Sequence, residues 1–577
     1  MAPPPSSYPP SARNNFTQVG TGLGDTMNEP STQKWSITSH DGTLVSSPII
    51  LHNSKANNAC YTDEFHVDHE RKLNEVRDLL NKVGEDYQLE GLVMIDAIQC
   101  LNIDYHFRKE IESILQCQDE TSRVHENDEH DLYQTALRFR LLRQEGHFVS
   151  AEVFDKFKNK EGKFKQELVE DIRGMMGLYE AAQLRIEGEH ILDEAESFCR
   201  RLFKACMPYL NSHEARLVES MIKHPYRKSL SRIGAKNFAN NFQGNFKWIT
   251  VLEELSNLDL KIVQSIHQKE LQQISHWWEE LGLAKELKLA RDQPLKWHMW
   301  SMEVLTDPSL SEQRIELTKP ISLVYIIDDI FDVYGTLDEL TLFTEAVTRW
   351  EFTDVNQLPN YMRTCFQTLF DITYEIGYKF FIVHGWNPIN TLRKSWVTLC
   401  KAFLAEAKWF ASGELPKADK YLKNGIISSG VHVVLVHMFF LLGQDLTKEC
   451  LDLVNDNNNI PGIINYTATI LRLWDDLGSA KDENQDGYDG SYLECFMNEH
   501  KGLLMKTARE HMIGMISDAW KCLNKECLSP NPFSSSFTKA SLNAARMVPL
   551  MYNYDDNHCL PDLEEHAMFV LNMINVT

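Results

Sequence analysis

Residues 321–335 read ISLVYIIDDIFDVYG, an apolar run that three aspartates interrupt. On a helix, Asp328 and Asp332 are one turn apart and share a face, with Asp329 to one side. Buried carboxylates are costly unless cations compensate them or they open onto a wet cavity. Hard divalent ions such as Mg²⁺ favour a few carboxylates together with water and phosphate oxygens. The run therefore predicts either a magnesium site or a solvated helix end.

A second apolar helix carries a similar set of oxygen ligands in the segment ILRLWDDLGSAKDE. Asp475, Ser479 and Glu483 follow one another at spacings of four and project from one stripe, whereas Asp476 lies off that stripe. Arg472, one turn before Asp475, is placed either to pair with it or to reach an anionic ligand. The alternative is an acidic helix end that runs into a loop. Two such stripes are much less probable by chance than one.

Together the two stripes suggest a substrate diphosphate that several metal ions clamp between facing helices. Arg291, in LARDQPLKW, is a candidate phosphate contact or an ordinary surface arginine. Departure of the diphosphate creates a carbocation, which aromatic faces stabilise without reacting. Four aromatic residues flank the acidic segments and are either walls for this cation or plain core residues: Trp297, Trp300, Tyr325 and Phe331.

The rest of the chain predicts an all-α fold. HERKLNEVRDLLNKV, which starts at His69, places its leucines and valines on one face with charges opposite, and this period recurs along the chain. No sustained alternation of period two is found, so we expect strands to be essentially absent. The helices become longer and more apolar near residue 260. We expect a flexible arm or short targeting segment at 1–68 and two helical domains at 69–260 and 261–577.

Composition limits the classes of function. The chain has 577 residues, and 82 acidic against 58 basic residues give a net charge of −24, which argues against nucleic-acid binding. Twelve cysteines without a CxxC pair favour a reducing compartment. Polar residues interrupt the apolar stretch 426–443, which predicts a buried helix and no membrane span. The first residues lack the apolar core of a secretory signal and contain one basic residue, Arg13, which favours the cytoplasm slightly over a plastid.

From about residue 69 onward, the sequence resembles the class I terpene synthases of plants. DDIFD at 328–332 looks like the first metal motif of that family, and DDLGSAKDE at 475–483 looks like the second, of form (N/D)DxxSxxxE. The resemblance implies a helical barrel with an amino-terminal helical domain, a prenyl diphosphate substrate and three Mg²⁺ ions, with Mn²⁺ as a possible substitute. It implies these metal ligands: Asp328, Asp332, Asp475, Ser479 and Glu483. It implies these substrate contacts: Arg291, Asp328, Arg472, Asp475, Trp300 and Tyr552, with Asp555 nearby.

Several departures from the family pattern carry information. The family often has RxR ahead of its first motif, whereas this chain reads Arg291-Asp292-Gln293, so one diphosphate arginine is missing. Trp35 lacks the tandem arginines that precede such a tryptophan in cyclic monoterpene synthases. Asn484 follows Glu483 where a basic residue is usual. These features, with the SSGVHVVLVH run, resemble the branch that makes acyclic products. No DxDD motif is present to supply the acid of class II chemistry.

The resemblance implies magnesium-dependent ionisation of geranyl or farnesyl diphosphate and capture of the allylic cation by water. The expected products are linalool and (E)-nerolidol, and proton loss to myrcene or ocimene is the alternative. A prenyltransferase is disfavoured because Ser479 stands where a second aspartate-rich motif needs an acid. A non-catalytic interaction protein would not need both stripes. We assign no general base and expect a monomer.

Overall fold

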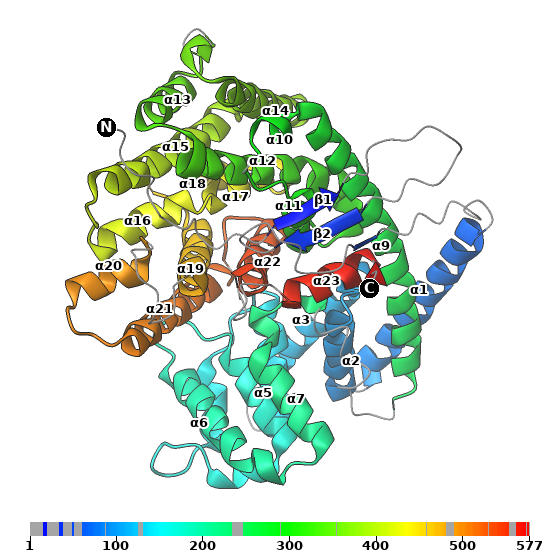
Figure 1. The fold of residues 1–577 in the computed structure, drawn as a ribbon. Helices are drawn as coiled ribbons and strands as arrows, with labels where there is room; N and C mark the ends of the chain where they lie inside the picture. Colours follow the sequence, from blue (N-terminus) through cyan, green and yellow to red (C-terminus); the bar gives the residue numbers. More distant parts are fainter. Residues whose placement is uncertain are drawn as a thin grey trace. The chain divides into compact units, whose positions relative to one another are not determined.

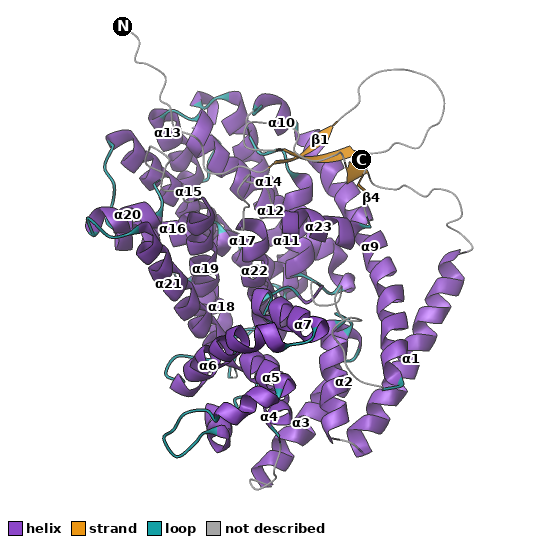
Figure 2. Cartoon of the chain, turned by 60° about the horizontal axis from the view of Figure 1, so that its bottom comes forward, coloured by secondary structure: helices purple, strands orange, loops and turns teal. Residues whose placement is uncertain are grey.

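The computed structural model describes most of the chain, in residues 15–19, 34–38, 49–50, 61–86, 88–124, 131–232, 246–288, 290–352, 355–456, 459–479, 490–528, 530–552, 561–572 and 574–575. The chain forms two compact units (Figure 1). Unit 1 comprises residues 1–53, 264–523 and 532–577, and unit 2 comprises 54–263 and 524–531. Helices make up nearly all of the described chain, as Figure 2 shows.

Unit 2 is helical and has two hydrophobic clusters. One cluster is centred on α1, α2 and the first half of α9, and the other on α4, α5 and α6. The helices of this unit are α1 (Tyr61–Asp86), α2 (Gln88–Cys100), α3 (Arg108–Val124), α4 (Leu132–Gln144), α5 (Ile172–Ala182), α6 (His190–Cys206), α7 (Ser212–Lys223) and the part of α9 (Trp248–Leu281) that ends at Val263, with short 3₁₀ turns η1 (Asp104–His106), η2 (Ala151–Phe157), η3 (Gln166–Glu170), η4 (Met207–Tyr209) and η5 (Tyr226–Lys228).

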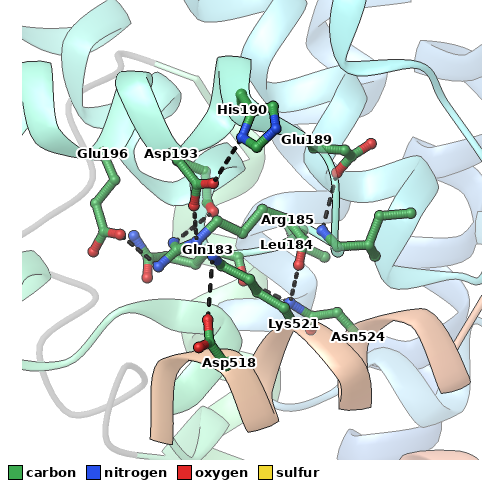
Figure 3. A network of polar contacts seen from close by, with 12 residues as sticks. Gln183, Leu184, Arg185, Glu189, His190, Asp193, Glu196, Asp518, Lys521 and Asn524 are labelled. Carbon is green, nitrogen blue, oxygen red and sulfur yellow. Dashed lines mark hydrogen bonds and ion pairs between the residues drawn. The ribbon is translucent and has the colours of Figure 1, made fainter. Parts of the chain in front are cut away.

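A polar network shows why residues 524–531 belong to unit 2. Asn524 donates hydrogen bonds of 2.9 Å to the carbonyl oxygens of Gln183 and Arg185 (Figure 3). The guanidinium of Arg185 in turn pairs with Asp193 at 3.1 Å and with Glu196 at 2.7 Å. Since the Arg185 side chain is buried, two carboxylates compensate a charge that would otherwise be costly to desolvate.

Unit 1 contains the remaining helices, which pack around α11, α12, α17, α19 and α22. Helix α12 packs against α11, α14 and α17, and α19 packs against α16, α17 and α22. Its elements are the second part of α9, α10 (Leu283–Glu286), α11 (Pro294–Val304), η6 (Pro308–Leu310), α12 (Ser311–Asp329), η7 (Ile330–Tyr334), α13 (Leu337–Arg349), η8 (Val355–Gln357), α14 (Asn360–His384), α15 (Ile389–Ser412), α16 (Ala418–Ser428), α17 (Val431–Leu442), α18 (Lys448–Asn455), α19 (Gly462–Ser479), α20 (Tyr492–Glu499), α21 (Met505–Glu526, whose last residues belong to unit 2), α22 (Ser535–Tyr552) and α23 (Pro561–Leu571).

A small antiparallel sheet was not predicted from the sequence. It joins β1 (Asn15–Val19), β2 (Lys34–Thr38), β3 (Ile49–Ile50) and β4 (Ile574–Asn575) in that order. In the last pairing, Ile49 is opposite Asn575, so the two strands come from opposite ends of the chain. These short strands leave in place the prediction that strands are essentially absent, and a pairing as distant in sequence as that of Ile49 and Asn575 leaves no local pattern. The all-α fold class is confirmed, and α1 begins at Tyr61, earlier than the predicted His69.

One segment, Ala418–Leu442, is long and apolar enough to cross a membrane. In the structure, Gly430 at φ 72° separates it into α16 and α17, and 67% of its most apolar window is buried inside the protein. Helix α17 packs against α12, α14, α15, α19 and α22. Packing in the core of unit 1 thus accounts for its hydropathy.

Candidate active site

The first acidic segment lies where α12 ends and changes its winding. The last residues of α12 are Asp328 and Asp329, and Ile330–Tyr334 continue as a π-helical turn that the Gly335 N–H closes on the Ile330 carbonyl at 2.9 Å. The Asp328 side chain is 29% exposed, and that of Asp329 is 1% exposed. Asp332, within the π turn, is exposed. The spacing predicted that Asp328 and Asp332 share one face of a regular α-helix. In the structure, a wider π-helical turn, of the kind often found at functional sites, begins between them.

Arg291 is held against this segment by the buried aspartate. Its backbone N–H donates to Asp329 Oδ2 at 2.7 Å, and its Nε lies 2.9 Å from Asp329 Oδ1. The guanidinium also pairs with Asp328, donates to the Tyr325 carbonyl at 3.1 Å and lies 4.9 Å from the Tyr325 ring centroid. Burial raises the pKa of Asp329, and the charge of Arg291 opposes that shift.

The second acidic segment, at the end of α19, repeats this arrangement. Arg472 pairs with Asp475 and, at 2.6 Å, with Asp476. The Asp475 side chain is 27% exposed and that of Asp476 is 1% exposed. Asp476 also accepts hydrogen bonds from the Tyr421 hydroxyl at 3.1 Å and from the Tyr492 N–H at 2.9 Å. Burial raises the pKa of Asp476 to about 6, against the opposing charge of Arg472.

In both acidic segments, the two adjacent aspartates therefore differ in burial and in the contacts they make. The second aspartate of each pair, Asp329 or Asp476, is buried and fixes an arginine. The first, Asp328 or Asp475, is half-exposed and available to a ligand. The sequence placed Asp329 and Asp476 off the metal-binding stripes, but it did not reveal that both anchor arginines.

The two half-exposed aspartates, Asp328 on α12 and Asp475 on α19, interact electrostatically. Burial raises the pKa of Asp475, the charge of Arg472 lowers it, and the negative charge of Asp328 raises it further. The structure thus brings together Asp328, Asp475, Arg291 and Arg472, as the sequence predicted. Ser479 ends α19, but its side chain is outside the described part of the chain, as are Glu483 and Asp555.

Lys296 is a further cation at this site that sequence reasoning missed. It lies in the first turn of α11, only 4% exposed, five residues after Arg291. Burial lowers its pKa to about 8; Arg291 lowers it further, and Asp475 opposes the shift. A signal was present in the sequence, because Lys296 follows soon after Arg291-Asp292-Gln293, where one arginine of the usual pair is absent.

Glu406, on α15, is a further acid near the two motifs. It accepts hydrogen bonds from Ser428 Oγ at 2.7 Å and Asn424 Nδ2 at 2.8 Å. Burial raises its pKa to about 7; Arg472 lowers it, and Asp328 raises it. In the sequence, KAFLAEAKWF reads as an ordinary amphipathic helix. Nothing there separates this glutamate from a solvated surface acid.

The predicted aromatic residues separate into two groups. Trp300 Nε1 donates to the Tyr325 hydroxyl at 3.0 Å, and a hydrogen bond links Tyr325 to Tyr552. These three rings are thus joined through Tyr325, whose ring lies beside Arg291. Trp297 is fully buried and packs edge-on against another tryptophan at 4.9 Å, so it is a core residue. Phe331 packs in an aromatic cluster and is also mostly buried.

Comparison with known proteins assigns this arrangement to a family. Residues 279–522 match the family model for the metal binding domain of the terpene synthase family, and residues 47–224 match that for the terpene synthase N-terminal domain. A probable terpene synthase of Ricinus communis is 57% identical over 88% of this chain and 89% of its own length. This chain belongs to the terpene synthase family.

Other members of the family are also similar over most of their length. An (E)-nerolidol synthase of Cannabis sativa is 52% identical over 87% of this chain and 92% of its own, and a chloroplastic S-(+)-linalool synthase of Arabidopsis thaliana is 46% identical over 96% of each. Grey poplar isoprene synthase, solved with three Mg²⁺ ions and dimethylallyl-S-thiolodiphosphate, superimposes with a TM-score of 0.80 at 33% identity over 90% of this chain and 99% of its own. The predicted family, the all-α fold and an enzyme of the lyase class are confirmed.

The described residues of this terpene synthase fit magnesium chemically. Asp328 and Asp475 offer half-exposed carboxylate oxygens, the ligand type that Mg²⁺ prefers. Burial and, to a smaller extent, repulsion by Asp328 raise the pKa of Asp475, and a bound cation relieves such repulsion. Arginines on both sides leave the site able to accept an anion once a metal is present.

Proposed function

We propose that this terpene synthase ionises geranyl and farnesyl diphosphate and quenches the allylic cation with water, giving linalool and (E)-nerolidol. The observation that carries the proposal is that two half-exposed aspartates, at the ends of α12 and α19, each pair with an arginine that a buried aspartate anchors. The names of two relatives, an (E)-nerolidol synthase and an S-(+)-linalool synthase, support this choice of products.

We assign the metal site to residues of both acidic segments and expect three Mg²⁺ ions, with Mn²⁺ as a substitute. The proposed ligands are Asp328, Asp332, Asp475, Ser479 and Glu483, with Glu406 as a further carboxylate close by. Bound metal supplies Lewis-acid stabilisation of the negative charge on the departing diphosphate. We also expect an active monomer.

The positive side chains hold the diphosphate, and the aromatic rings hold the organic cation. Arg291 and Arg472 offer planar guanidinium groups that suit phosphate oxygens, and Lys296 adds a third charge. When the allylic C–O bond breaks, its electron pair leaves with the diphosphate. The faces of Trp300 and Tyr325 stabilise the remaining cation by cation–π attraction. Water oxygen then bonds to the tertiary carbon, and the released diphosphate takes the proton, because no side chain is assigned as base.

The deciding experiment incubates purified enzyme with each diphosphate and identifies the volatile products by gas chromatography. With Mg²⁺ we expect linalool from geranyl diphosphate and (E)-nerolidol from farnesyl diphosphate, and EDTA should abolish both. Acyclic hydrocarbons such as myrcene and ocimene would indicate proton loss instead of water capture. Cyclic products would refute the acyclic assignment, and turnover that persists in EDTA would refute the mechanism.

A further inference from the structure

Three potential metal ligands meet in unit 2, which contains none of the residues described above for the active site. His69 comes from α1, His106 from η1 and Asp259 from α9. The Nε2 atoms of both histidines approach the same oxygen, Asp259 Oδ1, at 3.2 Å from His69 and 2.9 Å from His106. Among the described residues, this trio is the one group in which such ligand atoms all lie within 4.8 Å of one another.

These separations are close to those of a tetrahedral zinc site. Zinc holds imidazole nitrogen and carboxylate oxygen at about 2.0–2.2 Å, which sets neighbouring ligand atoms roughly 3.4 Å apart. The two nitrogen–oxygen distances are a few tenths of an ångström shorter, as hydrogen bonds require. If each ring proton shifts from Nε2 to Nδ1, small rotations of the two imidazoles turn both freed Nε2 lone pairs toward a shared metal ion beside Asp259 Oδ1. The two rings already meet edge to face, with centroids 5.3 Å apart.

Burial and charge also suit a cation. The side chains are 9% exposed for His69, 19% for His106 and 7% for Asp259. Asp259 accepts hydrogen bonds from both histidines and from Tyr105, so its carboxylate oxygens already face donor groups inside the protein. The Tyr105 hydroxyl lies 2.6 Å from each Asp259 oxygen and orients the carboxylate. Outer partners of this kind commonly support metal ligands.

We propose that His69, His106 and Asp259 bind one zinc ion, which ties α1 and η1 to α9 within unit 2. Two imidazole ligands favour zinc over magnesium, which prefers oxygen alone. Three protein ligands leave one position of a tetrahedral zinc ion for water, and the 19% exposure of the His106 side chain is consistent with solvent access to the site. This site is independent of the proposed catalysis, because it uses none of its residues.

The test measures zinc bound to the full-length protein, freed of any affinity tag and stripped with EDTA. The protein is dialysed against limiting Zn²⁺ with excess Mg²⁺, which occupies the oxygen sites, and its metal content is determined by mass spectrometry. We expect about one zinc per chain and a rise in the thermal unfolding midpoint, because a ligand that binds the folded state stabilises it. Co²⁺ in place of Zn²⁺ should give the visible absorption of a nitrogen-ligated ion, and this measurement needs no variant.

His106→Gln should lower the zinc affinity at least tenfold and remove the thermal shift. The matched control is His276→Gln, because His276 also pairs with a carboxylate, Glu280 at 3.2 Å, but on an exposed surface, and this variant should bind zinc as the wild type does. Circular dichroism checks that the variants fold. A wild type that retains no zinc, or a His106→Gln protein that retains as much, would show a hydrogen-bonded cluster only and would overturn the proposal.

Discussion

The buried carboxylate of Asp329 holds Arg291 twice, through the backbone N–H at 2.7 Å and through Nε at 2.9 Å. Asp476 holds Arg472 in a corresponding ion pair at 2.6 Å. Neither buried aspartate is exposed enough to ligate a metal ion. We therefore expect both to act as positioning residues, which place the arginines while the preceding aspartates face the substrate.

Replacing Asp329 with asparagine tests this role. Asp329→Asn removes the buried one of the two carboxylates that compensate Arg291 and leaves only its pair with Asp328, so we expect stability to fall by about 3 kcal/mol in urea unfolding. The freed guanidinium should also hold the diphosphate less well, raising KM for geranyl diphosphate about tenfold while kcat changes less. Asp371→Asn, at an exposed position on α14, is the control and should change stability by less than ~0.5 kcal/mol. An unchanged KM would remove Asp329 from the positioning role.

The half-exposed aspartates should behave differently. Asp328→Ala and Asp332→Ala each remove a proposed metal ligand, so we expect turnover to fall by roughly 10²-fold or more, corresponding to several kcal/mol of lost charge stabilisation. Helical circular dichroism should stay unchanged, because neither side chain is buried in the core. Asp338→Ala, at an exposed position in the next helix, is the matched control. Normal turnover of either variant would exclude that residue from the site.

Local periodicity in the sequence was enough to predict the site residues that share a face of one helix. Spacing placed Asp328 and Asp475 on separate apolar helices, and the structure brings them together. Spacing could not show what the buried neighbours Asp329 and Asp476 contact, because their partners lie on other segments. The prediction from spacing also treated the segment as one regular α-helix through Asp332, whereas the structure has a π-helical turn there.

Most features that the sequence patterns did not predict depend on contacts between residues far apart in sequence. Lys296 enters the site through the packing of α11 against α12, and Glu406 enters it from α15. Each is a single charged residue on a helix whose pattern looks ordinary. The strand pair of Ile49 and Asn575 joins the two ends of the chain, and no window of sequence contains both. Tertiary contacts of this kind leave no local signal.

Lys296 should contribute a positive charge to diphosphate binding. Lys296→Gln removes the charge, and we expect KM for the diphosphate to rise about tenfold, in line with the loss of one charge-assisted hydrogen bond. Lys296→Arg keeps the charge and should retain most of the affinity. Lys401→Gln, on the exposed face of α15, serves as control and should leave KM unchanged. Equal KM values for Lys296→Gln and the wild type would show that the missing arginine is not compensated here.

Gly430 should be sensitive to any side chain. It adopts φ 72° between α16 and α17, and a Cβ there would collide with Val324, one turn before Asp328 on α12. We expect Gly430→Ala to cost roughly 2–4 kcal/mol, from backbone strain plus overpacking, and to lower kcat by shifting α12. Gly385→Ala shares the positive φ of 71° but has open space around the new Cβ, so it should cost only about 1 kcal/mol. Equal losses of unfolding free energy for Gly430→Ala and Gly385→Ala, measured by urea unfolding, would show that a Cβ at residue 430 does not collide with Val324.

The buried histidine His437 should make stability depend on pH. Burial lowers its pKa to about 4, and its Nδ1 donates to the Val433 carbonyl at 2.7 Å. Since an unfolded histidine titrates near 6.5, the unfolded state binds the proton first as the pH falls below that value. Each pH unit between 6.5 and 4 then costs the folded state about 1.4 kcal/mol, and this contribution is fully present only above pH 6.5.

The His437→Phe variant isolates this contribution, because all other titrating groups are shared with the wild type. From pH 6.5 to pH 5, the wild type should lose about 2 kcal/mol more unfolding free energy than the variant does. Urea unfolding at several pH values measures both slopes, and between pH 7 and pH 8 the slopes should coincide. Phenylalanine keeps an aromatic ring against Trp396, whose ring centroid lies 5.2 Å away, so the packing is retained. Parallel slopes below pH 6.5 would mean that His437 is not held neutral in the fold.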